Sequence, residues 1–274
     1  MILMQIKIMS FNIRYLNRHD GKNIWENRKE LVIHIINKYN PDIIGFQEVK
    51  YPQYQFLTEK LDSYHHYGVG RKDGKHKGEH SLISYKKGFK CIESDTFWLS
   101  STPNKPSKRW GGFLKNIIIH QHLPRIVSWC KLKTTENKEF YIYNTHFPLR
   151  KQARLHSIEL IEKKIRPNKD KPLILLGDFN FDPFSKEYKQ MTQILDDSYN
   201  NINEEEPIPP PTTFHGFTGA KIKSKSPEKV GRIDFIWINQ KIKIKEIKII
   251  MDNPSEDSQI YPTDHWPIFG IAEI

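Results

Sequence analysis

Polar and apolar residues along this chain follow two periods, one of two residues and one of three to four. The first is typical of a β-strand with one buried face, and the second of an amphipathic helix. Strands are predicted for residues 5–12, 42–46, 80–85, 89–99, 126–132, 140–146, 172–176, 232–238, 242–250 and 266–274. Helices are predicted for residues 25–38, 52–61, 151–166 and 184–195. The polar, proline-rich segments 100–112 and 200–211 are interpreted as loops.

Two connections between predicted strands have the length of a hairpin turn. Lys86-Lys87-Gly88 joins the strands at 80–85 and 89–99, and Glu136-Asn137-Lys138 joins those at 126–132 and 140–146. Strands and helices are mixed along the chain, and no repeat or linker divides it. We therefore expect one domain, residues 1–274, that forms an α/β sandwich with sheets inside and helices outside.

The composition is that of a folded protein with a basic surface. Of 274 residues, 37% are hydrophobic, and 43 Lys and Arg outnumber 32 Asp and Glu, for a formal net charge of +11. A basic balance favours phosphate-rich partners such as nucleic acid or an anionic membrane surface. A lysine-rich, well-solvated surface explains the charge nearly as well. The two cysteines, Cys91 and Cys130, have no CxxC spacing, so neither a thiolate metal site nor a disulfide scaffold is expected.

No segment has the pattern of a targeting signal or a membrane span. The apolar N-terminus is interrupted by Gln5 and Lys7, with no basic region before them. The longest apolar run elsewhere, residues 114–119, contains Lys115 and Asn116. We therefore expect a soluble, cytoplasmic protein that needs no obligate protein partner.

Polar side chains follow three of the predicted strands directly. They are Asn12, the pair Gln47-Glu48, and the run Asp178-Phe179-Asn180. Loops at the ends of buried strands often carry function, because the scaffold holds them rigidly. Oxygen ligands without cysteine suit a hard cation such as Mg²⁺, and Glu48 is the best single candidate ligand. One carboxylate at a strand end is common in α/β proteins, whereas three polar strand ends together are less common.

Two histidines lie at the ends of other predicted strands. His146 ends the strand at 140–146, and the pair Asp264-His265 precedes the last strand. A carboxylate that contacts an imidazole orients the ring and raises its basicity. A single histidine at a strand end is more often structural than catalytic. A catalytic role for His146 or His265 is therefore supported only when it is considered together with the other segments.

Taken together, these segments resemble the endonuclease/exonuclease/phosphatase superfamily, which includes DNase I, exonuclease III and nocturnin-like deadenylases. The matching runs, between Met9 and Pro267, are MSFNIR, IGFQEV, YNTHF, LLGDFN, GRIDFIW and YPTDHWP, in that order. The runs GVGRKDGKHKGEHSLISYKK, TFWLS and LPRIVSW are similar to a bacterial subgroup nearer the deadenylases. The resemblance implies a four-layer α/β sandwich in which two mixed, largely antiparallel sheets are flanked by helices.

The resemblance also implies roles for the residues at matching positions. Glu48 would bind Mg²⁺ or Mn²⁺, and Asn12 would contact the metal directly or lie one hydrogen bond away from it. Asp178 would position or deprotonate the attacking water, and Asn180 would orient the water and the phosphate.

Further residues would contact the phosphate. His265 would touch the scissile phosphate and would be held in place by Asp264, while His146 would stabilise the charge on it. Asp234 would lie near the metal or hydrogen-bond to the histidines. The resemblance also implies that the substrate is contacted by Arg125 and Asn144, and that His215 either touches the substrate or packs in its loop.

Several features lie outside this pattern. Residues 112–122 look like an insertion next to the strand of Arg125, and Glu79 is interpreted as a solvated strand end. Basic clusters occur in predicted loops at residues 71–77, 105–109 and 221–225. They form either a track for a phosphate backbone or ordinary solvated loops. Aromatic residues near them stack on bases or pack in the rim: Trp110, Phe214 and Phe217.

We therefore predict a Mg²⁺-dependent phosphoesterase that attacks a phosphodiester or phosphomonoester, in nucleic acid or nucleotides first, with an activated water. The alternative enzyme would hydrolyse a small phosphodiester, an inositol phosphate or a phospholipid head group. A non-catalytic nucleic-acid-binding relative ranks lower, because it should lack at least one of Glu48, Asp178 and His265.

Overall fold

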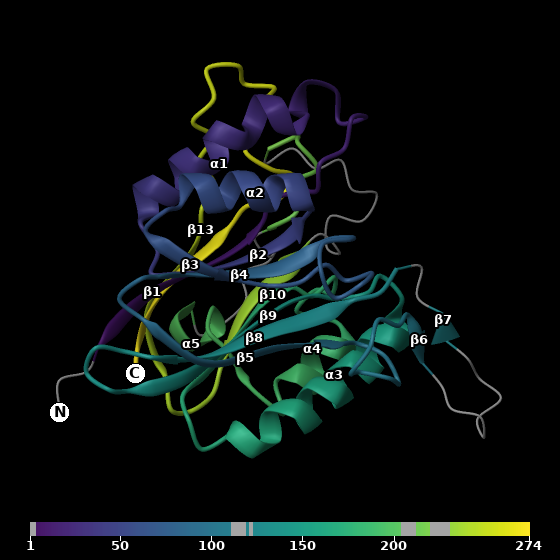
Figure 1. Cartoon of the computed structure of the whole chain (residues 1–274), viewed down its shortest axis with the longest axis vertical. Helices are drawn as coiled ribbons and strands as arrows, with labels where there is room; N and C mark the ends of the chain where they lie inside the picture. Colours follow the sequence, from purple (N-terminus) through teal and green to yellow (C-terminus); the bar gives the residue numbers. More distant parts are fainter. Residues whose placement is uncertain (1–3, 111–118, 121–122, 204–211, 220–230) are drawn as a thin grey trace.

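The computed structural model describes residues 4–110, 119–120, 123–203, 212–219 and 231–274. In these residues two six-stranded sheets pack against each other (Figure 1). Helices α1 (Trp25–Tyr39) and α2 (Tyr51–Lys60) cover one sheet. Helices α3 (Lys151–Ile165) and α4 (Lys186–Met191) cover the other. The predicted four-layer α/β sandwich is therefore confirmed.

The first sheet has the strand order β13-β14-β1-β2-β4-β3. Its strands are β1 (Gln5–Asn12), β2 (Ile43–Val49), β3 (Tyr64–Tyr67), β4 (His80–Lys86), β13 (Lys243–Ile249) and β14 (Ile268–Glu273). β1 runs parallel to β2 and antiparallel to β14, with Gln5 opposite Glu273 and Ser10 opposite Ile268. The N-terminal and C-terminal segments of the chain are thus joined in the centre of one sheet.

The second sheet has the strand order β11-β12-β10-β9-β8-β5. Its strands are β5 (Lys90–Trp98), β8 (Ile126–Lys133), β9 (Glu139–His146), β10 (Leu173–Asp178), β11 (Asp196–Asp197) and β12 (Asp234–Ile238). β9 and β10 run parallel, whereas β10 and β12 run antiparallel, with Asp178 opposite Asp234.

The remaining elements are short. They are the helix α5 (Asn200–Asn203), the 3₁₀ turns Gly21–Asn23 and Arg166–Asn168, and the strand pair β6 (Arg109–Trp110) and β7 (Ile119–His120). Among the described residues, no helix has both the length and the apolar character that crossing a membrane requires.

Three apolar clusters separate the four layers. Strand β10 shows why, because all of its residues are buried and alternate between its two faces. Ile174 and Leu176 point into the cluster between the two sheets, while Leu173 and Leu175 point into the cluster under α3 and α4. A third cluster packs α1 against the outer face of the first sheet. The continuous apolar run of β10 therefore reflects a strand covered on both faces.

One of the two predicted hairpins is wrong. Strand β4 belongs to the first sheet and β5 to the second, so Lys87 to Phe89 carries the chain from one layer to the next. Phe89 is 6% exposed and packs in the cluster between the sheets, which holds this crossing in place. The second predicted hairpin is confirmed, because β8 and β9 pair antiparallel from Val127–Thr145 to Lys133–Glu139.

Other predicted elements differ in their extent. The helix expected over residues 184–195 is limited to α4, which begins after Ser185, whose side chain accepts a hydrogen bond from the Tyr188 N–H. Turns replace the helix after Met191, where the Leu195 N–H donates to the Met191 carbonyl. Strand β3 was not predicted, and α5 lies within a predicted loop. Most of the proposed insertion at 112–122 is outside the described residues.

Candidate active site

The carboxyl ends of four strands meet at one edge of the two sheets. β1 and β2 are parallel in the first sheet, β9 and β10 are parallel in the second, and the two pairs contact each other. Polar residues that end parallel strands gather at the same edge of a sheet. At or beside these strand ends lie Asn12, Glu48, His146 and Asp178.

A cleft of about 390 Å³ opens at this edge. The predicted site residues that line it are Glu48, Arg125, His146, Asp178, Asn180, Asp264 and His265. Asn12 and Asp234 are each 1% exposed and bind these residues from behind. The structure thus brings together every predicted site residue except Asn144 and His215.

A distorted backbone aims Glu48 into the cleft. The pairing of β2 with β4 shifts register between Phe46 and Val49, and Glu48 has a φ of 65°. Irregularities of this kind redirect a side chain, and left-handed φ values in residues other than glycine are retained where the surroundings enforce them. Two hydrogen bonds then hold the carboxylate, from the Tyr15 N–H at 3.0 Å and from Asn12 Nδ2 at 3.4 Å.

Asn12 connects the acidic residues of the two sheets. Its Nδ2 lies 3.0 Å from Oδ2 of Asp178, in addition to its contact with Glu48. Its Oδ1 accepts a hydrogen bond from the Arg14 N–H at 3.0 Å. With its oxygen engaged in this way, Asn12 positions the two carboxylates by donating to them.

Strand β10 requires glycine at position 177, one residue before its end. Gly177 has a φ of 148°, and a Cβ there would lie 2.0 Å from the Thr145 carbonyl oxygen. This close approach of β10 to β9 places Asp178 beside His146. Asn180 follows with a φ of 52°, and its Nδ2 donates to the Phe147 carbonyl at 3.0 Å. Its amide oxygen is the group that remains for a ligand in the cleft.

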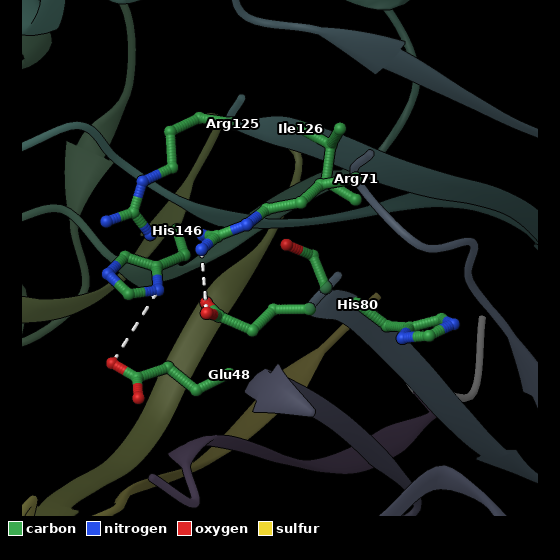
Figure 2. A pocket seen from close by; sticks show the side chains of 8 residues that line it. Glu48, Arg71, His80, Arg125, Ile126 and His146 are labelled. Carbon is green, nitrogen blue, oxygen red and sulfur yellow. Dashed lines mark hydrogen bonds and ion pairs between the residues drawn. The ribbon is translucent and has the colours of Figure 1, made fainter. Parts of the chain in front are cut away.

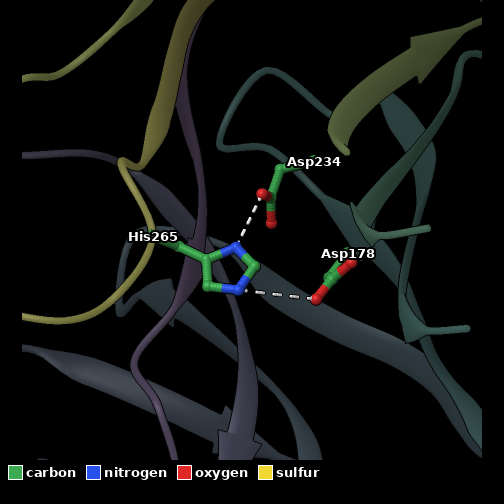
Figure 3. A group of neighbouring side chains, drawn as sticks. All are labelled: Asp178, Asp234 and His265. Atoms are coloured by element: carbon green, nitrogen blue, oxygen red, sulfur yellow. Dashed lines mark hydrogen bonds and ion pairs between the residues drawn. The ribbon is translucent and has the colours of Figure 1, made fainter. Parts of the chain in front are cut away.

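His265 is held by Asp234, not by Asp264. Its Nδ1 lies 2.9 Å from Oδ2 of Asp234, and its Nε2 lies 3.9 Å from Oδ2 of Asp178 (Figure 3). Asp264 faces Arg14 instead, with 3.8 Å between Oδ2 and Nη1. The predicted role of Asp264 in holding the ring is therefore wrong, because residues adjacent in sequence point different ways from the extended segment before β14.

The two central groups have strongly shifted pKa values. Burial lowers the pKa of His265, but the carboxylates of Asp234, Asp178 and Asp264 outweigh it and raise that pKa to about 10. Burial and the neighbouring charges of Asp234 and Glu48 raise the pKa of Asp178 to about 7. At neutral pH the site therefore pairs an imidazolium with a carboxyl group able to take up or release a proton.

His146 is a neutral imidazole. Burial lowers its pKa well below the usual value, and the positive charges of Arg125 and Arg71 lower it further. Its Nε2 lies 3.4 Å from Oδ2 of Asp178, and its Nδ1 lies 4.0 Å from Oε1 of Glu48. A neutral ring between two carboxylates contributes hydrogen bonding rather than charge.

Arg71 and Glu79 belong to the site, although Glu79 was interpreted as a solvated strand end and the loop of Arg71 as either a phosphate track or a solvated loop. Arg71 Nη2 donates to Oε1 of Glu79 at 2.7 Å, and the two side chains are 5% and 13% exposed. Both line the cleft beside Arg125. The interpretation of Glu79 as a solvated strand end is therefore wrong. Its position after a basic loop suggested exposure, whereas the ion pair with Arg71 allows both groups to be buried.

Asn144 and His215 do not line the cleft. Asn144 lies between the sheets, where its Nδ2 donates to the carbonyls of Phe46 and Leu82 and its Oδ1 accepts from Gln47. It is 0% exposed, so it joins the two sheets rather than contacting a substrate. His215 is 1% exposed and stacks on Trp266, with ring centroids 4.1 Å apart. The predicted substrate contact of Asn144 is therefore corrected to a role in joining the sheets, and His215 takes the loop-packing role that was its alternative.

The rim of the cleft carries exposed apolar side chains. Phe214 is 40% exposed and lines the cleft. Its ring packs edge to face against the His265 ring, with the ring centroids 5.1 Å apart. Leu123 and Leu149 line it as well and are 39% and 68% exposed. Phe217 instead lies near the Arg28 guanidinium. The side chain of Trp110 and the basic cluster at 221–225 lie outside the described residues.

Sequence patterns did not identify Arg28. This residue is 0% exposed, and its guanidinium donates to the carbonyls of Asn23, Arg14, Ile13 and Pro262. It therefore fastens the loop after β1 to the segment that carries Asp264 and His265. Arg28 precedes the buried residues Val32 and Ile35 by four and seven positions, so helical spacing does place it on the buried face of α1, although a charged residue there was not singled out.

The donor set of the cleft fits a hard divalent cation. Carboxylates of Glu48, Asp178 and Asp264 line one cleft, and ligand atoms of Asp178, Asp234 and His265 lie within 4.8 Å of one another. Oxygen-rich sites without thiolate suit Mg²⁺ or Mn²⁺. Within that cluster, Nδ1 of His265 already binds Asp234.

Comparisons with known proteins agree with this geometry. A sequence profile of the Endonuclease/Exonuclease/phosphatase family matches residues 9–265. A Bacteroides thetaiotaomicron protein of that family is 30% identical, with a TM-score of 0.86 over 100% of this chain and 99% of that one. A mannosyl-6-phosphatase of the same bacterium is also 30% identical, with a TM-score of 0.84 over 98% and 99%.

Curated relatives match over a smaller part of their own length. A probable RNA exonuclease of Saccharomyces cerevisiae is 24% identical over 209 residues, which are 69% of this chain and 40% of that protein. The chain spans 40% to 60% of the length of the curated relatives that it matches. The profile match and the whole-length structural likeness show that the chain belongs to the endonuclease/exonuclease/phosphatase family, whose members hydrolyse phosphoester bonds.

Proposed function

We propose that this protein hydrolyses phosphate esters with the help of a divalent metal ion, Mg²⁺ or Mn²⁺. The observation that carries the proposal is the pairing of Asp178, with a pKa of about 7, and protonated His265 in one cleft with Glu48. Such a site can activate water, bind a phosphate and hold a cation. A non-catalytic relative would have no need for this arrangement.

Each residue has a role that follows from its position. Asp178 takes a proton from the attacking water, and the amide oxygen of Asn180 orients that water. His265 donates from Nε2 to an oxygen of the phosphate, while Asp234 holds the ring and its charge. His146 adds a neutral hydrogen-bonding group beside Asp178. A cation at Glu48 would supply Lewis-acid charge to the phosphoryl oxygens.

Two classes of substrate fit the proposal. Nucleic acid or a nucleotide was the first expectation, and the net charge of +11 and the likeness to a probable RNA exonuclease support it. A small phosphate ester is the second, and it is supported by the whole-length likeness to a mannosyl-6-phosphatase, which has the higher sequence identity. The cleft of about 390 Å³ has room for a group of sugar or nucleoside size.

A metal-depletion experiment tests the proposed chemistry. The protein is treated with EDTA, dialysed, and assayed with Mg²⁺, Mn²⁺ or no metal on DNA, RNA, nucleotides, sugar phosphates and nitrophenyl esters. Hydrolysis should require added metal. It should fall on the order of a hundredfold or more in Asp178→Asn, which keeps the hydrogen bond to Asn12 but cannot accept the water proton.

A matched control and a contrary outcome make this experiment decisive. Asp182→Asn makes the same change in the loop just after the site, where the carboxylate only accepts a bond from the Phe184 N–H, and should retain activity. Lack of hydrolysis of every substrate with every metal would contradict the proposal.

A further inference from the structure

A narrow recess extends from the cleft between Glu48 and strand β4. It has a volume of about 10 Å³ and is lined by Glu48, Arg71, Glu79, Arg125 and His146, among others. In Figure 2 the guanidinium groups of Arg71 and Arg125 converge on the His146 ring, with Glu48 on the other side of that ring. The recess therefore joins the proposed metal side of the cleft to a pair of arginines.

Both arginines are more than nine-tenths buried, and their hydrogen bonds are incomplete. Arg71 is 4% exposed and Arg125 is 8% exposed. Among the described residues, Nε of Arg71, Nη1 of Arg125 and Nδ1 of His146 are buried without a hydrogen-bond partner. A buried donor left without an acceptor is destabilising, and more so if it is charged, so several such groups around one recess point to a bound partner that accepts from them.

The charges in the recess point to an anionic ligand. Arg71 is neutralised by its ion pair with Glu79. Glu48 is the other acid that lines the recess, and in the proposed enzyme its charge is taken by the cation. Among the described residues that line the recess, no acid is then left to pair with Arg125. Burial and the charge of Arg71 lower the pKa of Arg125 to about 10, which still leaves it protonated at neutral pH.

The size of the recess limits what can enter it. A volume of about 10 Å³ accommodates roughly one water-sized atom. A phosphodiester carries organic groups on two of its oxygens, whereas a phosphomonoester carries one and has three terminal oxygens. In the proposed site the cation, His265 and the recess each take one phosphate oxygen, and a monoester has a terminal oxygen for each of them. A diester has only two terminal oxygens, so an ester oxygen would occupy one of the three positions, and the recess has no room for its organic group. The single organic group of a monoester fits the wide cleft, beside Phe214 and Leu149.

We propose that the Arg71–Arg125 recess binds a terminal oxygen of a phosphomonoester, so that the natural substrates are phosphomonoesters of a sugar or nucleoside rather than internal phosphodiesters. This inference rests on the proposed function. In the reaction a bond forms between the water oxygen and phosphorus as the bond to the ester oxygen breaks. The water proton passes to Asp178, the leaving oxygen takes up a proton from solvent, and the products are inorganic phosphate and an alcohol.

The selectivity of Arg125 variants tests the inference. Arg125→Met is compared with the wild type on p-nitrophenyl phosphate and on bis-p-nitrophenyl phosphate, with Mg²⁺ present. We expect kcat/KM for the monoester to fall on the order of a hundredfold, while that for the diester changes little. Inorganic phosphate should inhibit the wild type competitively and should inhibit Arg125→Met much more weakly. Arg125→Lys should recover part of the monoester activity.

Two further variants keep the test independent of folding. Arg71→Met combined with Glu79→Gln removes both charges of the buried pair, so no unpaired charge remains, and should show the same selective loss. Arg166→Met makes the matching change at the end of α3, where the side chain is 65% exposed and pairs with Glu162, and should behave as wild type. Thermal unfolding of each variant shows whether it is folded.

Other outcomes would overturn the inference. A parallel loss of monoester and diester hydrolysis in the Arg125 variants would show a general positioning role for this residue. A wild-type enzyme that cleaves the diester but not the monoester would exclude the proposed substrate class and leave the proposed function intact. Absence of both activities with every metal would contradict the proposed function itself, and the inference with it.

Discussion

Asp234 shows how one buried side chain determines the state of the site. It lies in β12, is 1% exposed, and contacts Nδ1 of His265 at 2.9 Å. Its charge offsets the burial of the imidazole, which by itself would lower the pKa of His265. The carboxylate therefore keeps the ring both oriented and protonated, although Asp234 is buried behind that ring and does not line the cleft.

Asp234→Asn should separate these two effects. The amide retains the size and a hydrogen bond but removes the charge, so the pKa of His265 should fall from about 10. We expect kcat to decrease on the order of a hundredfold with a smaller change in KM, because the charge acts mainly on the transition state. NMR titration of the His265 ring checks the pKa. If the pKa of His265 falls and kcat stays unchanged, catalysis does not need His265 in its protonated form.

At the scale of elements, strand ends place the reactive groups by departing from regular geometry. Glu48 has a φ of 65° within β2, and Asn180 has a φ of 52° just after β10. The register shift in β2 turns Glu48 toward the cleft, while its neighbour Gln47 points between the sheets and binds Asn144. In a regular strand, successive side chains would simply alternate between the faces of the sheet.

Gly177→Ala tests the close approach of β9 and β10. The new Cβ would meet the Thr145 carbonyl at 2.0 Å, and φ is 148°. The free energy of unfolding should fall by about 1–3 kcal/mol or more. Gly88→Ala is the matched control, because a Cβ there meets nothing within 4 Å, and it should be near neutral. Urea denaturation measures both, and equal stability of the two variants would argue against this strain.

At the scale of elements, polar residues at the ends of predicted strands were the most useful signal in the sequence. It singled out Asn12, Glu48, His146 and Asp178 as candidate functional residues, and the structure brings these strand ends together at one edge. It failed for Asn144, which has the same polarity two residues before the end of β9 but points between the sheets. Polarity along a strand does not reveal whether a buried amide binds a ligand or two neighbouring backbones.

On the scale of the whole molecule, the two sheets are joined by buried polar groups as well as by their apolar cluster.

Acidification should lower the free energy of unfolding, because several histidines are buried in the neutral form. His215 is one of them, since burial and the charge of His265 lower its pKa to about 3. His66 and His80 also have pKa values lowered by burial.

The sign of the pH effect follows from these shifts. A folded-state pKa below the unfolded value of about 6.5 means that the unfolded chain binds protons first as pH falls. Stability should therefore be constant with respect to His215 above about pH 6.5 and decline below it, by about 1.4 kcal/mol per pH unit until the folded pKa is reached. His215→Phe retains the stacking on Trp266 and should show a shallower decline. Urea denaturation at several pH values measures the slope, and identical slopes would contradict this assignment.

The sequence by itself determined most of the longer elements, the layered fold and the identity of most candidate active-site residues. Hydrophobic periodicity is local, and the ordered runs from Met9 to Pro267 carry family information, so both are readable without coordinates. Tertiary structure alone decided which carboxylate holds His265, that Arg71 and Glu79 are buried together, and that β4 and β5 lie in different sheets. These facts depend on contacts between residues far apart in the chain and on the burial of charge, which no local pattern specifies.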